Sequence, residues 1–111
     1  MKLTHALRVI EQLRRIDPDM PIAQAHCLIA IAMSEDGLSL VDLAKKVGIG
    51  AASTSRYVAA LGKVDRHRET GLGLVQAHED PLERRKKIVS LTKKGKTFIE
   101  ELTGEHHADL S

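Results

Sequence analysis

The stretch that most constrains the fold is LVDLAKKVGIGAASTSRYVAAL, residues 40–61, which has the pattern of two short helices joined by a tight turn. Ser39 is expected to cap the first helix, which ends at Gly48, a residue type that readily adopts the left-handed conformation of a helix end. In the second helix Thr54, Val58 and Leu61 fall on one face, and small residues fall on the opposite face. The stretch therefore predicts a helix-turn-helix, whose second helix can approach a surface closely.

Apolar spacing and cap residues predict three more helices. Residues 3–16 carry apolar side chains three and four positions apart, which is helical periodicity. A second helix, about 22–33, is apolar on nearly all sides and is expected to be the most buried, with Asp19 as a candidate cap. Thr92 is expected to cap a last helix over 93–102.

Two short strands, 73–78 and 86–91, are predicted between the helix-turn-helix and the last helix. Pro81 lies in the turn between them, and four consecutive cationic residues, 84–87, lie near its tip. Four helices, a hairpin and a helix are the order of a winged helix-turn-helix. The predicted fold class is mainly α with a small β-hairpin, in a single domain spanning 1–111.

Composition excludes several classes of protein. Aromatic residues make up only 2 %, which argues against proteins that stack single-stranded bases on aromatic side chains. A single cysteine, Cys27, rules out an internal disulfide and fits a reducing compartment. No signal peptide is recognisable, and the longest apolar run, 27–33, is too short to span a bilayer. We expect a cytoplasmic protein with no membrane partner.

Catalytic and metal-binding patterns are not found in the sequence. The six histidines are scattered or lie in the polar tail, without the spacing of a zinc site. The glycines at 48 and 50 follow a predicted helix rather than a strand, so they do not fit a dinucleotide-binding loop. Cys27 lies in the most apolar stretch and is interpreted as a core residue rather than a redox sensor. We expect no enzyme activity, no metal and no cofactor.

The hairpin sequence GLVQAHEDPLERRKKIVSLTKKG, residues 73–95, resembles the wing of the MarR (multiple antibiotic resistance regulator) family of transcription regulators. Gly73-Leu74-Val75 match the start of the family pattern, and Arg85, Val89, Leu91, Thr92 and Gly95 match the rest, with Glu83 in place of the usual aspartate. The resemblance covers about residues 22–102. Two departures are a longer connection between Leu61 and Gly73 and a shorter C-terminal region.

The resemblance implies a homodimer on a pseudo-palindromic duplex, with recognition helices in major grooves roughly 10 base pairs apart. The wing arginine, Arg85, would reach the adjacent minor groove, and Glu83 would orient it. Arg56 can donate two hydrogen bonds to guanine, and the N–H groups at 50–52 suit a phosphate. The family's effector pocket is expected to be reduced or absent, so the sequence does not decide whether the protein binds a small-molecule effector.

These interpretations divide the chain into a helix-turn-helix at 39–63, a wing at 73–91 and dimerisation helices at 3–16 and 92–103. The predicted DNA contacts are Ser39, Gly50, Ala51, Ala52, Ser53, Ser55, Arg56, Lys63, Arg84, Arg85 and Lys86. The predicted dimer interface is Leu3, Leu7, Ile10, Leu13, Phe98, Ile99 and Leu102.

The sequence favours a sequence-specific, double-stranded DNA-binding transcription regulator, with a dimeric repressor of prokaryotic, phage or plasmid origin as the expectation. One alternative is a winged-helix module that binds another protein, which the modest net charge of +2 allows. Another is an accessory protein in plasmid or phage replication or partition, which would bind DNA in the same way.

Overall fold

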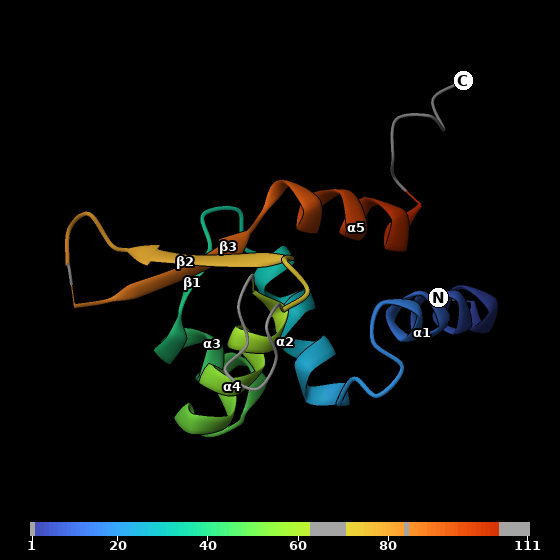
Figure 1. The fold of residues 1–111 in the computed structure, drawn as a ribbon, viewed down its shortest axis with the longest axis horizontal. Helices are drawn as coiled ribbons and strands as arrows, with labels where there is room; N and C mark the ends of the chain where they lie inside the picture. The colour runs from blue at the N-terminus through green and yellow to red at the C-terminus, as the bar shows by residue number, and fades with distance from the viewer. Residues whose placement is uncertain (1, 63–70, 84, 105–111) are drawn as a thin grey trace.

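The computed structural model describes residues 2–62, 71–83 and 85–104, and Figure 1 shows their arrangement. The predicted fold class, mainly helical with a small β-hairpin, is confirmed. The elements in chain order are α1 (Leu3–Ile16), α2 (Ile22–Ala32), β1 (Leu38–Ser39), α3 (Leu40–Val47), α4 (Ala51–Leu61), β2 (Val75–Glu79), β3 (Lys87–Leu91) and α5 (Lys93–Thr103).

Helix α2 lies at the centre, between the α3–α4 pair and the sheet (Figure 1). Its residues Cys27, Leu28 and Ile31 are fully buried, as expected for a helix that is apolar on nearly all sides. The core around α2 is aliphatic, with buried leucines contributed by α3 and α4. Burial of these side chains is the main stabilising contribution that holds the helix-turn-helix against α2.

The sheet has three strands in the order β1-β3-β2, all antiparallel. Strand β1, of two residues, was not predicted, because so short a segment carries no periodicity. It pairs Leu38 with Val89, and the preceding Gly37 has a φ of 85°. A Cβ at Gly37 would lie 2.6 Å from the carbonyl oxygen of Val89, so only glycine fits this approach.

Local hydrogen bonds set the ends of α3 and α2. The Ser39 hydroxyl accepts a hydrogen bond from the Asp42 N–H at 3.1 Å, and Gly48 ends α3 in the left-handed region, both as predicted. The suggestion that Asp19 caps α2 is wrong. Pro21 is the N-cap, and its carbonyl accepts the Gln24 N–H at 3.0 Å.

Helix α1 lies apart from the α2–α4 body and close to α5 (Figure 1). Two residues predicted for the dimer interface, Leu13 and Leu102, are instead buried within the chain, so neither offers a free surface. Phe98 and Ile99 of α5 pack partly against the same core. Leu3, at 87 % exposure, stands with Leu7 and Ile10 on the exposed side of α1.

Candidate nucleic-acid interface

Helix α4 presents a face of small side chains to solvent. Ala51, Ala52 and Ser55 are exposed, whereas Thr54 is buried and its hydroxyl donates to the Gly50 carbonyl oxygen at 2.9 Å. The predicted inner and outer faces of this helix therefore have the orientation that the sequence indicated. An outer face made mostly of small side chains allows the helix backbone to lie close to a partner surface.

Arg56 is the one long cationic side chain among the described residues of α4, and it is held by a neighbour. Its Nη2 donates to the Ser53 hydroxyl oxygen at 3.2 Å, one turn earlier on the exposed surface. A guanidinium has five N–H donors, so this bond leaves four for a partner. Ser53 can therefore orient Arg56 while the guanidinium reads a base edge, a pairing that the sequence analysis did not anticipate.

The first turn of α4 has no side-chain cap. Gly50 is the N-cap, with φ −70° and ψ 161°, and no side chain bonds to the first N–H groups. The first N–H groups of any helix lack intrahelical acceptors, and they attract anions together with the helix dipole. The backbone at 50–52 is thus chemically suited to a phosphate, and its contact with DNA stays a prediction.

Thr92 and Gly95 fix the base of the hairpin, formed here by residues 73–75 and 91–95. The Thr92 hydroxyl donates to the Gly73 carbonyl oxygen at 2.7 Å and accepts the Gly95 N–H at 3.0 Å. A Cβ at Gly95 would lie only 2.0 Å from the Leu74 carbonyl oxygen. The Leu-Thr-x-x-Gly part of the wing pattern is thus explained by the tight seating of α5 on the hairpin.

Beyond Val75 the hairpin extends away from the body, and the rest of β2 is exposed (Figure 1). The tip, defined as residues 80–86, is closed by the Asp80 N–H donating to the Lys86 carbonyl and the Lys86 N–H donating to the Glu83 carbonyl, both at 2.9 Å. Arg85, Lys86 and the first residue of β3, Lys87, are exposed there. A projecting, positively charged loop is suited to contact with phosphates.

The predicted pairing of Glu83 with Arg85 differs from the structure. The Glu83 carboxylate lies 3.9 Å from Lys86 Nζ, because the turn bond between these two residues brings their side chains together.

Ser39, predicted as a DNA contact, is only 3 % exposed, and its hydroxyl already caps α3, so its side chain is excluded from the interface. Lys63 and Arg84 lie outside the described residues.

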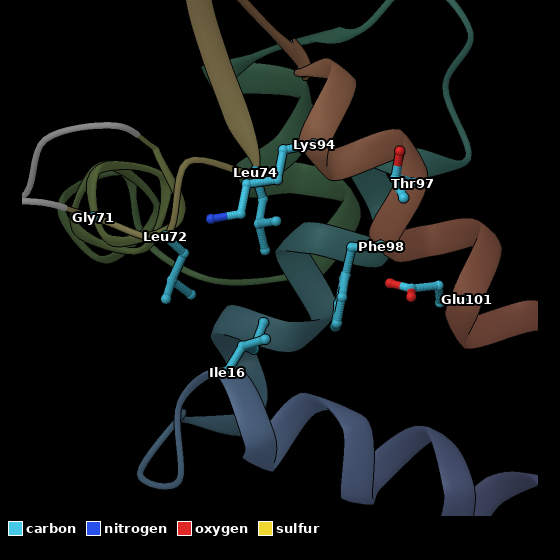
Figure 2. Close-up of a pocket in the computed structure, with 8 residues that line it drawn as sticks. All are labelled: Ile16, Gly71, Leu72, Leu74, Lys94, Thr97, Phe98 and Glu101. Atoms are coloured by element: carbon cyan, nitrogen blue, oxygen red, sulfur yellow. The ribbon is translucent and has the colours of Figure 1, made fainter.

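A cleft of about 570 Å³ lies between the end of α1, the segment 71–74 and α5 (Figure 2). Ile16, Leu72 and Phe98 converge on it from these three segments, so the cleft is mainly apolar. Lys94 and Glu101 supply opposite charges at its edge. The expectation that an effector pocket is reduced or absent stays a prediction, because a cleft of this volume does not by itself identify a ligand.

Cys27 is fully buried, and burial raises the pKa of its thiol above the ordinary value. A protonated, inaccessible thiol is a poor nucleophile, which supports the interpretation of Cys27 as a core residue. Within the described parts of the chain, no three histidine, cysteine, aspartate or glutamate side chains gather as metal ligands would. None of the helices described is both long and apolar enough for a membrane span.

Neither a family model nor a curated protein matches the chain. Its structure is similar to several solved ones. The S. aureus MepR–DNA complex superposes with a TM-score of 0.72 at 22 % identity, covering 93 % of this chain and 77 % of MepR. A probable transcriptional regulator from Pseudomonas aeruginosa gives 0.64 at 22 % identity, covering 97 % and 80 %. MarR gives 0.65 at 22 % identity, covering 92 % of this chain and 66 % of MarR. The chain thus has the winged-helix fold of MarR and MepR.

Proposed function

We propose that the protein is a double-stranded DNA-binding transcription regulator that places α4 in the major groove and the hairpin tip in the adjacent minor groove. The observation that carries the proposal is the combination of a small-residue face on α4 with a projecting cationic hairpin. The similar MepR structure is a complex with DNA, which supports the same use of this fold.

The two elements would make different contributions. Arg56, oriented by Ser53, is suited to a bidentate contact with guanine, worth about 1–3 kcal/mol of discrimination. Arg85 and Lys86 are suited to phosphates or to the negative potential of a narrow A·T-rich groove. Affinity would therefore depend on salt through the tip, and base preference would depend on α4.

A homodimer would cover the exposed apolar side of α1. Leu3, Leu7 and Ile10 repeat at helical spacing and are exposed, and an exposed apolar stripe of this kind marks an interaction site. Phe98 and Ile99, half-buried on the nearby α5, are proposed to join that interface. A two-fold dimer would bind a pseudo-palindromic site, and repression by occupancy of such a site is the proposed role.

Selection of bound duplexes from a random pool tests the proposal. The expected result is a palindrome with half-sites about one helical turn apart. Arg56→Ala should relax the base preference at one position in each half-site, whereas Arg8→Ala, at an exposed arginine of α1 outside the predicted DNA contacts, should leave that preference in place. Recovery of no preferred sequence, or an unchanged preference in the Arg56 variant, would remove the assigned recognition helix.

A protein-binding module is the second candidate, favoured by the scarcity of base-reading side chains on α4, where the exposed face includes Ala51 and Ala52. Titration with random-sequence duplex at low salt separates the two candidates, since non-specific DNA binding is electrostatic and strongest there. Complete absence of binding under those conditions would favour a protein partner.

A further inference from the structure

We infer that Leu82 is an apolar wedge that inserts between base steps of the minor groove and bends the duplex. This inference rests on the proposed function and adds a contact that the cationic residues of the tip cannot make. Proteins that bend DNA from the minor groove frequently insert leucine, isoleucine, methionine, phenylalanine or proline side chains between base steps.

Leu82 is 93 % exposed, more than any other large hydrophobic side chain in the described part of the chain. At the hairpin base, by contrast, Val75 is buried and Leu91 is half-buried against the core. An isolated leucine at the outermost loop therefore contributes nothing to the core. Exposure of this apolar side chain to water is unfavourable in free energy, and contact with an apolar partner would remove that cost.

The loop holds Leu82 in place rather than leaving it free. The Asp80 carboxylate accepts the Leu82 N–H at 2.9 Å, which forms a local turn. The backbone bonds from Asp80 to Lys86 and from Lys86 to Glu83 close the loop on either side of it. Pro81 precedes Leu82 and fixes one further φ angle. A side chain presented on a fixed turn loses little conformational entropy when it inserts.

The charges beside Leu82 determine which partner fits. Arg85, Lys86 and Lys87 are exposed in the following residues and at the start of β3. The carboxylates nearest to Leu82 are engaged within the tip, Asp80 with the Leu82 N–H and Glu83 with Lys86 Nζ at 3.9 Å. The cations that follow Leu82 in the chain suit the phosphates along a minor groove, whose floor is formed by the edges of stacked base pairs. A lipid surface would also attract cations, but binding there scales with buried apolar area. One leucine supplies little of that area, so the inference commits to DNA.

The test uses the full chain and the duplex recovered by selection from a random pool. Fluorescence transfer between dyes at the duplex ends reports bending, and 2-aminopurine placed in the minor-groove segment reports unstacking. Leu82→Ala is expected to abolish the 2-aminopurine increase and the bend, and to weaken binding about tenfold. The dependence of affinity on salt should stay unchanged, because no phosphate contact is lost.

Two control variants separate the wedge from other roles. Leu82→Met keeps an apolar side chain of similar size and should retain bend and unstacking. Ile22→Ala removes a side chain that is also highly exposed, at 82 %, but lies at the start of α2, and it should change neither signal. If the parent binds the duplex and Leu82→Ala bends and unstacks it to the same extent, the inference is overturned and the proposed function stands. If the parent itself selects no duplex, the proposed function fails first, and binding of the parent to anionic vesicles but not to duplex would assign the tip to lipid.

Discussion

The base and the tip of the hairpin differ in almost every physical respect, although the two strands that join them are each only five residues long. At the base, Val75 is buried, Thr92 makes two side-chain hydrogen bonds and Gly95 meets a backbone carbonyl without room for a methyl group. At the tip, Leu82 and Arg85 are exposed, and the hydrogen bonds among its described residues connect tip residues to one another.

This contrast separates stability from recognition within one supersecondary element. The base fixes the direction in which the hairpin leaves the body, and the tip presents exposed side chains, Leu82 and Arg85 among them, to partners outside the chain. Substitutions at the base should therefore unfold the protein, whereas substitutions at the tip should change binding and leave stability intact. The predictions below test that separation, beginning with the largest effect.

Gly95→Ala should destabilise the protein by about 3 kcal/mol, because the new methyl group would overlap the Leu74 carbonyl and force α5 away from the hairpin. Urea unfolding followed by circular dichroism measures the change. Gly50→Ala is the control, since a Cβ there meets nothing within 4 Å, and its cost should stay below about 1 kcal/mol. Equal stability of the Gly95 variant and the parent would contradict the tight seating of α5.

Thr92→Val should cost about 2 kcal/mol, because it removes the N-cap of α5 and leaves the Gly73 carbonyl without its donor. Thr92→Ser keeps the hydroxyl and should recover most of the loss. Thermal unfolding of the two variants gives the comparison. If valine were tolerated as well as serine, the two hydrogen bonds would not anchor the hairpin base.

Arg85→Ala should leave the unfolding transition in place and weaken duplex binding several-fold, with the slope of log affinity against log salt reduced by about one. Fluorescence anisotropy at several salt concentrations measures both quantities. Lys2→Ala, a cation at the far end of the molecule on α1, should alter neither. An Arg85 variant with the affinity and salt slope of the parent would remove the tip from the interface.

Glu83→Gln should have the smallest effect. Its ion pair with Lys86 is solvent-exposed and spans 3.9 Å, so unfolding should change by less than about 0.5 kcal/mol. Loss of a negative charge from the cationic tip should tighten duplex binding slightly at low salt. A weaker affinity would instead assign Glu83 an orienting role, as the sequence analysis proposed.

The helices and the wing were predictable from sequence because local rules determine them. Apolar periodicity located α1 to α5. The caps at Ser39 and Thr92 were found because a residue with a hydroxyl group directly precedes each of those helices. The orientation of α4 followed from Thr54 and Leu61 on one face. Strand β1 was missed because its two residues are held by pairing with a distant strand.

Three residues predicted for binding surfaces, Leu13, Leu102 and Ser39, are buried within the chain, which a local sequence pattern does not reveal. An apolar stripe indicates that a face is covered but not whether the same chain or a second copy covers it, so Leu13 and Leu102 were assigned to a dimer interface. Likewise, Ser39 lies next to an exposed helix in sequence, yet β1 pairing buries it. The pairs Ser53–Arg56 and Glu83–Lys86 depend on side-chain directions that spacing alone does not determine.

Amide chemical-shift mapping on addition of the selected duplex tests the central claim most directly, because it reports every element at once. The account predicts that the perturbed amides fall in two groups, at residues 50–56 of the α4 region and at residues 82–87 of the hairpin, while the base at 91–95 shifts little. Perturbations confined to α1 or α2, or no perturbation at low salt, would contradict the assignment of α4 and the hairpin tip as one DNA-binding surface.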